Sequence, residues 1–309
     1  MKELARFVIL PIFVATFLLA TGPKAEAQTK QGVGTQTLTL GLVFQGPSKP
    51  VEERFRPLVD YAARKLSPRG ETKGTVALAS TPGQMMKLLD EKRVDFYMES
   101  PYATYLINRL GAAKLLLRRW KGGHAEYRSL IFTSKESGIG RLEDLRGKLL
   151  AFEDPGSTSG YFLPKLFLLK KGFSVVEKPG LDGRVSTNEI GYIFANSDTN
   201  MLNLVLKKKV GAGAFSNDDY ANLNDASKAS MSILGESESM PRHLVSVRKD
   251  LPDPIVKRLK EILLNMHQDG EGQKILGQTD NTTKFDPLPG GEEAVRRKLV
   301  ELYRPRRSN

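Results

Sequence analysis

The stretch "KLLAFEDPGSTSGYFLPKLFLLKKG", residues 148–172, predicts a strand, a polar turn and a helix in immediate succession. Residues 148–152 are an apolar run, and an amphipathic run begins at Tyr161, directly after the turn. In an open α/β sheet, ligands bind beyond the carboxyl ends of the strands, where loops lead into helix N-termini. The stretch therefore predicts an α/β fold and makes the turn a candidate binding site.

The turn is rich in hydrogen-bond donors. Ser157, Thr158 and Ser159 carry hydroxyl groups, while Gly156 and Gly160 allow the main chain to approach a ligand closely. The first backbone N–H groups of a helix have no internal partner, so oxygen-rich anions are favoured there. A single serine is enough to cap a helix, however. The turn is either a helix cap or an oxyanion site, and the sequence alone leaves both interpretations open.

Other chemistries fit the turn poorly. A Walker loop needs Lys-Ser/Thr after the glycines, and a nucleophile elbow reads G-x-S-x-G, whereas Thr158 is central here with no obvious histidine partner downstream. Cysteine is absent, which excludes thiolate sites and disulfides. The three histidines, His124, His243 and His267, do not have HxxxH spacing. We therefore expect no enzyme activity, metal or cofactor, and an exported hydrolase using Thr158 or a serine as nucleophile remains an alternative without a visible base.

The rest of the chain repeats the alternation of strands and helices, which predicts βαβ units and mainly parallel sheets. Two sections share this order: a Ser/Thr turn, a Met/Leu helix, a short apolar strand and a polar loop with tyrosine. These sections are "STPGQMMKLLDEKRVDFYMESPYATY" and "SDTNMLNLVLKKKVGAGAFSNDDYANL". The common order predicts two similar α/β lobes.

Two extended segments, 126–135 and 243–252, leave and rejoin the first lobe. They predict a two-stranded hinge. The expected boundaries are 35–128 with 242–309 for lobe 1, and 129–241 for lobe 2. His124, just before the hinge, is expected to be a structural histidine.

The N-terminus has the features of a secretory signal. Lys2 and Arg6 precede an apolar segment, and "AEA" at 25–27 supplies small residues for cleavage near Ala27. We therefore expect the mature protein in the periplasm. The net charge of +12 would suggest nucleic acid in a cytosolic chain. For an exported chain, attraction to anionic solutes or surfaces is the better interpretation, and no nucleic-acid partner is expected.

Several motifs together resemble those of a known family. "DLRGKLLAFEDPGSTSGYFLPKLFLLKKG" is similar to the signature of the phosphate/phosphite/phosphonate-binding proteins that serve ABC importers. "DFYMESPYATYL", "SNDDY" and "MPRHLVSVRKDLP" resemble that family's motifs in lobe one, lobe two and the return crossover. The resemblance covers roughly residues 37–285. It implies a type II periplasmic binding fold, with two lobes that close on a tetrahedral phosphorus oxyanion.

The resemblance also implies a set of ligand-binding residues. Ser157, Thr158, Ser159 and Gly160 would grip the oxyanion, Tyr102 beside Ser100 would lie across the cleft, and Asp218 would stand where relatives hold an ammonium group. Two positions depart from the family pattern. Ser197 stands where many members have histidine, and Glu99 precedes Ser100, where the family has Gly-Pro in place of Ser100-Pro101. Glu99 either faces the cleft, where it would repel a phosphate, or pairs with a neighbour outside it.

The expected function is that of a periplasmic solute-binding protein of an ABC importer. It would bind phosphonate, phosphite or phosphate by hinge closure and deliver the ligand to a permease in the inner membrane, as a monomer. The alternative is a binding protein for another small anion or zwitterion that presents its ligand to a sensor kinase.

Overall fold

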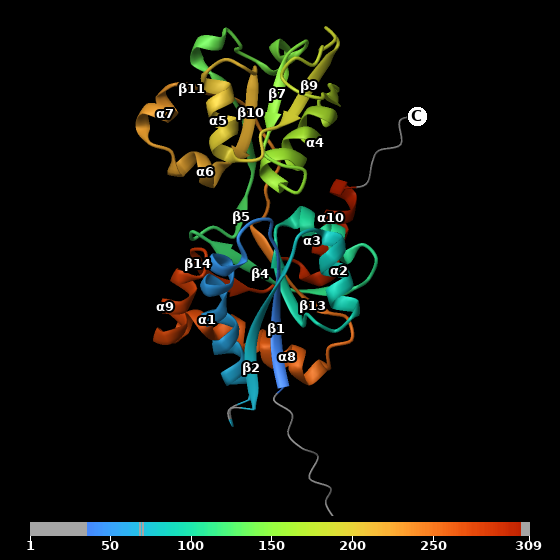
Figure 1. Cartoon of the computed structure of the whole chain (residues 1–309), viewed down its shortest axis with the longest axis vertical. Coiled ribbons are helices and arrows are strands. Elements are labelled where there is room, and N and C mark those ends of the chain that lie inside the picture. The colour runs from blue at the N-terminus through green and yellow to red at the C-terminus, as the bar shows by residue number, and fades with distance from the viewer. Residues whose placement is uncertain (1–35, 68, 70, 304–309) are drawn as a thin grey trace, which may run out of the picture. The chain divides into compact units, whose positions relative to one another are not determined.

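The computed structural model of the chain describes residues 36–67, 69 and 71–303. The signal sequence predicted for residues 1–27 lies outside them. The described residues form two six-stranded sheets with helices packed against them, so the chain has two α/β lobes (Figure 1). A third, two-stranded sheet joins them.

Lobe 1 is built from both ends of the chain, and Figure 1 shows its blue N-terminal strands beside orange and red C-terminal helices. Its sheet has the order β14-β4-β13-β3-β1-β2. The strands are β1 (Gln36–Val43), β2 (Thr72–Ala79), β3 (Phe96–Glu99), β4 (Ala113–Lys121), β13 (His243–Arg248) and β14 (Thr282–Asp286). The helices are α1 (Ser48–Leu66), α2 (Pro82–Asp90), α3 (Pro101–Asn108), α8 (Asp253–Asn265), α9 (Gly270–Gln278) and α10 (Gly291–Tyr303), with the 3-10 turn η4 (Met266–Gln268).

Lobe 2 is one continuous stretch of chain. Its sheet has the order β11-β6-β10-β7-β9-β8. The strands are β6 (Ser129–Ser134), β7 (Leu149–Phe152), β8 (Ser174–Glu177), β9 (Glu189–Phe194), β10 (Ala212–Ser216) and β11 (Met231–Glu236). The helices are α4 (Leu163–Lys170), α5 (Asp198–Leu206), α6 (Asn217–Asn222) and α7 (Asp225–Ala229), with η1 (Lys135–Ser137), η2 (Leu142–Leu145) and the π-helical turn η3 (Thr158–Phe162).

Both sheets are mixed rather than mainly parallel. In lobe 1, β1 runs parallel to β2 and β3, but β13 is antiparallel to both β3 and β4, and β14 is antiparallel to β4. In lobe 2, β7, β8, β9 and β10 pair in parallel, and β6 is antiparallel to β10 and β11. The prediction of mainly parallel sheets was therefore wrong for lobe 1. The chain returning from lobe 2 enters that sheet as β13, opposite in direction to β3, and no local sequence pattern specifies this direction.

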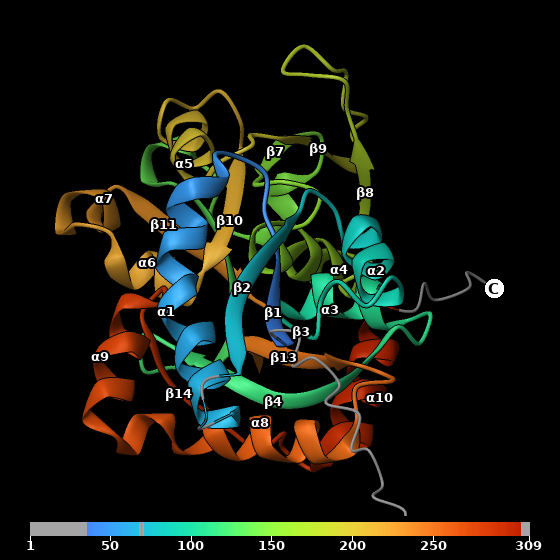
Figure 2. The ribbon, with the colours of Figure 1, turned by 60° about the horizontal axis from the view of Figure 1, so that its bottom comes forward.

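The helix predicted after the first strand forms with the expected apolar face. Val51, Phe55, Leu58 and Val59 are buried along α1, as helical spacing requires. This face packs against the lobe 1 sheet, while α8 and α9 lie beside α1 (Figure 2). The main core of lobe 1 thus lies between α1, α8 and the sheet.

The hinge predicted between the lobes is present as a short antiparallel ladder, but its second strand lies before the predicted segment 243–252, of which residues 243–248 form β13 of the lobe 1 sheet. β5 (Glu126–Tyr127) pairs with β12 (Met240–Pro241). The ladder is extended by one bond, because the Arg242 N–H donates to the Ala125 carbonyl at 2.7 Å. Both crossover segments are therefore held side by side where the chain passes between lobes.

A buried arginine ties β4 to β14 in lobe 1. The Arg119 side chain is 2% exposed, and its Nη2 lies 3.0 Å from Asp280 Oδ2. Its Nε donates to Thr282 Oγ1 at 2.8 Å, and Nη2 also donates to the carbonyls of Thr279 and Asp280. Asp280 therefore neutralises a cation that water cannot reach.

None of the helices in the described part of the chain is long and apolar enough to span a membrane.

Candidate functional site

The polar turn follows β7 and opens as a π-helical turn, not as the regular α-helix that the sequence predicted. The Phe162 N–H donates to the Ser157 carbonyl, and the Leu163 N–H donates to the Thr158 carbonyl, both five residues back. Pro164 accounts for this widening, because proline has no N–H and its ring would collide with the carbonyl of Gly160 in a regular helix. The amides of Thr158 and Ser159 therefore precede the first helical hydrogen bond.

Ser157 caps this turn. Its hydroxyl accepts a 2.9 Å hydrogen bond from the Gly160 N–H. The sequence left capping and anion binding open for the turn, and the structure shows that Ser157 is the cap. Ser159 takes part differently, since its carbonyl accepts a 2.6 Å hydrogen bond from Ser129 Oγ. No hydrogen bond of the Ser159 hydroxyl occurs among the described residues.

Thr158 connects lobe 2 to lobe 1. Its Oγ1 accepts from the Tyr102 N–H and donates to Ser100 Oγ, each at 3.0 Å. A hydroxyl has one donor and two acceptor sites, so these two bonds use its donor and one of its acceptor sites. Neither partner is a general base. A ligand oxygen that accepts the Thr158 hydroxyl proton must displace Ser100.

Tyr102 lies at the same contact but presents its ring to other aromatic side chains. The ring stacks on Phe162 with centroids 4.6 Å apart and lies 5.3 Å from the ring of Tyr303. The Phe162 and Tyr303 rings are 4.1 Å apart. The structure thus brings together Ser100, Tyr102 and Thr158 from the predicted set, with the Tyr102 backbone rather than its phenol on Thr158.

The turn has an acidic neighbour that sequence reasoning missed. Burial, followed by the charge of the nearby Asp198, raises the pKa of Glu153 to about 7, while the Ser157 hydroxyl opposes the shift. Gly160 packs directly on this residue, because a Cβ at position 160 would lie 2.6 Å from Glu153 Cβ and Oε2. Glu153 was visible in "EDPGSTSG", but only the fold reveals that it turns back onto the glycine.

Glu99 pairs with a neighbouring strand. Its Oε1 accepts a 2.5 Å hydrogen bond from the Val43 N–H, at the end of β1. Burial raises the pKa of Glu99 to about 7, and the backbone amides of Val43 and Ser100 partly offset the shift. Of the two interpretations given for this residue, the structure supports pairing with a neighbour.

The raised pKa values of Glu99 and Glu153 predict that the protein loses stability as the pH rises from about 5 to 8. The folded-state pKa of Glu99 lies near 7, above its ordinary value of 4.5, so the folded protein binds more protons between these values. Unfolding free energy should therefore fall through this range, by about 2 kcal/mol for Glu99 between pH 5 and pH 8. The variant Glu99→Gln should lack this contribution. Urea unfolding at pH 5, 6, 7 and 8 measures it, and an E99Q protein whose stability parallels the wild type at every pH would contradict it.

Asp218 lies at the hinge, with its carboxylate already paired. Its Oδ2 accepts from Arg242 Nε at 2.8 Å, and its Oδ1 lies 2.7 Å from His124 Nδ1. Asn217 Nδ2 also donates to Oδ1. The expectation that His124 is structural is consistent with this contact. The Asp218 carboxylate is therefore already paired within the protein, and the role toward a ligand ammonium that the resemblance implied stays a prediction.

Ser197 caps α5, accepting a hydrogen bond from the Asn200 N–H at 3.2 Å. It follows β9 at the same sheet edge as the polar turn, because the Asn196 N–H donates to the Glu153 carbonyl. Within the described residues, its hydroxyl makes no hydrogen bond to Thr158 or Asp218. Ser197 is thus near the turn but is not joined to the Ser100–Thr158 contact.

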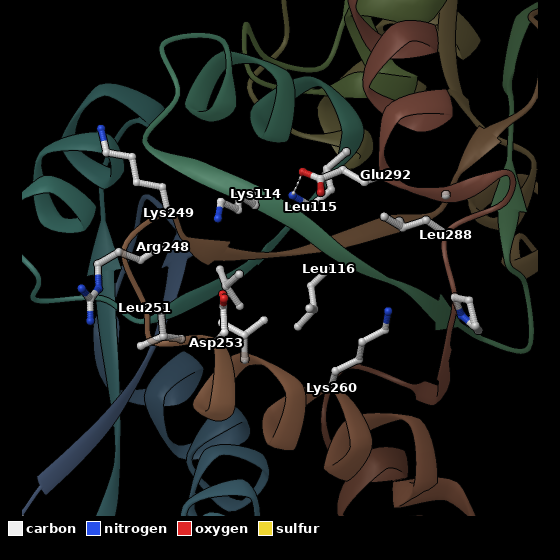
Figure 3. Close-up of a pocket in the computed structure, with 14 residues that line it drawn as sticks. Lys114, Leu115, Leu116, Arg248, Lys249, Leu251, Asp253, Lys260, Leu288 and Glu292 are labelled. Carbon is white, nitrogen blue, oxygen red and sulfur yellow. Dashed lines mark hydrogen bonds between the residues drawn. The ribbon is translucent and has the colours of Figure 1, made fainter.

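A separate cavity of about 300 Å³ lies in lobe 1 between α8 and strands β4 and β13. Lys114 and Lys260 line it together with apolar side chains such as Leu116 and Leu288, and the Glu292 carboxylate accepts from the Leu115 N–H at 3.1 Å (Figure 3). None of the predicted site residues lines this cavity. No cluster of three metal-ligating side chains occurs in the described parts of the chain.

Comparison with known proteins gives a family for this geometry. A family model described as "ABC transporter, phosphonate, periplasmic substrate-binding protein" matches residues 40–289. The phosphate-import protein PhnD of Mycolicibacterium smegmatis is 27% identical over 168 residues, which are 53% of this chain. The matched stretch spans 50% of the length of that relative.

Solved structures show the same architecture. XAC2383 from Xanthomonas citri, bound to ATP, is 30% identical with a TM-score of 0.79, and the match covers 86% of this chain and 95% of that one. PhnD1 from Prochlorococcus marinus, in complex with methylphosphonate, is 16% identical with a TM-score of 0.64 over 87% of this chain and 97% of that one. The fold is thus that of type II periplasmic binding proteins, as the sequence predicted.

Proposed function

Because the chain belongs to the family of periplasmic substrate-binding proteins of phosphonate ABC transporters, we propose that it binds a small phosphorus oxyanion. Phosphonate, phosphite and phosphate are the candidate ligands. The protein would deliver the ligand to a permease of the inner membrane, after cleavage of the signal near Ala27, and would act as a monomer. Members of this family are binding proteins rather than enzymes, and the match supports an importer over presentation to a sensor kinase.

One observation carries the proposal: the turn at the carboxyl end of β7 reaches the N-terminus of α3 in the other lobe. Thr158 Oγ1 bonds both the Tyr102 N–H and Ser100 Oγ. The amides at the starts of η3 and α3 and the hydroxyl groups of Ser100 and Thr158 therefore meet at one place. Such groups favour anions, because helix N-termini carry partial positive charge and unpaired N–H donors.

Binding would act through the hinge. We place the lobe boundaries at 128/129 and 241/242, next to the β5–β12 ladder. An anion that replaces the direct contact between Thr158 and lobe 1 would bridge donors of both lobes. It would then have greater affinity for the state in which the lobes are close and would shift the population towards that state.

Removing two hydroxyl groups from the turn tests this function. The double variant Ser157→Ala, Ser159→Ala should bind its best ligand at least tenfold more weakly, because hydrogen bonds to charged groups are worth about 1.5 to 3 kcal/mol each. Calorimetric titration of the mature protein with phosphate, phosphite, methylphosphonate, 2-aminoethylphosphonate and sulfate measures the loss. ATP extends the panel to phosphate esters, because the Xanthomonas citri relative was solved with ATP.

The matched control is Ser174→Ala, Ser186→Ala, which removes two exposed serines of the same lobe. This control should bind as the wild type does. Ser157 also caps the turn, so thermal unfolding should confirm that the test variant is folded at the titration temperature. Equal affinity in the folded test variant and the wild type would move the site away from the turn.

A further inference from the structure

Arg242 stands at the point where the return crossover enters lobe 1, and most of its hydrogen-bonding capacity is unused. Its side chain is only 11% exposed, and its Nε donates to Asp218 Oδ2 at 2.8 Å. Within residues 36–303, leaving aside 68 and 70, neither Nη nitrogen has a hydrogen-bond or ion-pair partner. A guanidinium has five N–H donors, so the four on the Nη nitrogens remain available to a ligand.

The orientation of this side chain is fixed from two sides. Asp218 holds Nε, and the guanidinium lies over the Tyr127 ring, 4.4 Å from its centroid. His124 and Asn217 hold the other carboxylate oxygen of Asp218. The Arg242 fork is therefore preorganised, which reduces the entropy lost when it binds a ligand.

This fork lies next to the proposed oxyanion site. Tyr127, whose ring lies beneath the guanidinium, is two residues before Ser129, and Ser129 Oγ donates to the Ser159 carbonyl of the turn at 2.6 Å. Asp218 is the second residue of α6, the helix after β10, and the turn follows β7, which is parallel to β10. Both therefore lie at the carboxyl-end edge of the lobe 2 sheet, where ligands of open α/β sheets bind.

The surroundings of the turn make a cation necessary. Glu153, Asp198 and Asp219 lie close enough to affect one another electrostatically, and all three are acidic. A phosphorus oxyanion brought to this place would be repelled unless a positive group opposed the carboxylates. A guanidinium binds tetrahedral oxyanions through two parallel N–H···O bonds, which a lysine cannot do.

We propose that Arg242 binds the oxyanion directly through its Nη groups, with Asp218 as the residue that positions it. This inference rests on the proposed function and names the ligand class within it. Because Asp218 already holds an internal cation, the ligand need not bring an ammonium group. The site should therefore take simple or esterified phosphorus oxyanions, and 2-aminoethylphosphonate should have no advantage over methylphosphonate.

Substitution of Arg242 tests the inference. Arg242→Met should weaken methylphosphonate binding at least tenfold, and Arg242→Lys should lose less, because it keeps the charge without the fork. The affinity ratio of 2-aminoethylphosphonate to methylphosphonate should rise at least tenfold in R242M, because Asp218 is then free to accept the ligand ammonium. A residue with a merely structural role would not change this ratio. The control Arg141→Met removes an arginine that is 73% exposed and should change neither value.

The outcomes separate this inference from the proposed function. Wild-type binding of methylphosphonate or phosphate with R242M affinity within twofold would overturn the role of Arg242 and leave the proposed function standing. A wild type that binds 2-aminoethylphosphonate at least tenfold more tightly than methylphosphonate would also overturn it, even if R242M does not fold. A wild type that binds none of the anions would reject the proposed function and this inference together.

Discussion

Replacing Asp280 by alanine is expected to lower the free energy of unfolding by about 3 to 5 kcal/mol, because it leaves a buried cation without its counter-charge. Arg119 is 2% exposed, and Asp280 Oδ2 is the carboxylate oxygen within 3.0 Å of it. The carbonyls of Thr279 and Asp280 would remain as acceptors but carry no full charge. Urea unfolding of wild type and Asp280→Ala at pH 7 measures the loss.

A double-mutant cycle distinguishes the buried charge from general damage to β14. In the double variant Arg119→Met, Asp280→Ala, no charge is left buried, so it should be more stable than D280A alone. The control Glu293→Ala removes an ion pair with Arg296 whose partners are about 60% exposed, and it should cost less than about 1 kcal/mol. A D280A protein that loses no more than this control would show that the carbonyls alone satisfy Arg119.

Gly160→Ala is expected to lower the free energy of unfolding by about 2 to 3 kcal/mol and to impair anion binding as well. The added Cβ would lie 2.6 Å from Glu153 Cβ and 2.9 Å from Ser157 Oγ, closer than real atoms approach. Overpacking in a buried place typically costs about 1 to 3 kcal/mol. The collision would also push Ser157 away from the Gly160 N–H that it caps. Thermal unfolding and phosphate titration measure the two effects.

Gly277→Ala is the matched control for this variant. Position 277 lies inside α9, and no atom lies within 4 Å of the place that an alanine Cβ would occupy, so alanine should be neutral or should stabilise by about 0.5 to 1 kcal/mol. If G160A proved as stable as the wild type, Glu153 would have to move away at no cost. The turn would then be far more adaptable than its packing indicates.

The sequence predicted the parts of the fold that local patterns encode. The apolar face of α1 and the strand-turn-helix unit around residue 157 appear where their periodicity placed them. The return crossover instead pairs at Met240–Pro241, before the segment 243–252 that the alternation indicated. The directions of β13 and β14 did not follow from the sequence. They depend on which strands the returning chain pairs with, and this is a property of the whole lobe: β13 lies between β3 and β4, and β14 pairs with β4.

The candidate site shows the same division. The sequence "STSG" predicted that the turn offers hydroxyl groups and amides. It did not predict which groups these hydroxyls and amides hydrogen-bond. Asp218 and Arg242 are 24 residues apart, and only the crossover brings them within 2.8 Å. Glu153 likewise folds back onto a glycine seven positions away through the π-helical turn. The contacts that the sequence did not predict at the candidate site are therefore mainly long-range pairings of charged side chains.

The position of β13 in the sheet also constrains the order in which the protein can be made. Lobe 2 is continuous in the chain, so all its strands have been synthesised once residue 236 is added. The sheet of lobe 1 cannot close then, because β13 separates β3 from β4. Domains generally fold as units. Strands β1 to β4 must therefore wait for β13 and β14, which keeps lobe 1 unfinished until translation is nearly complete.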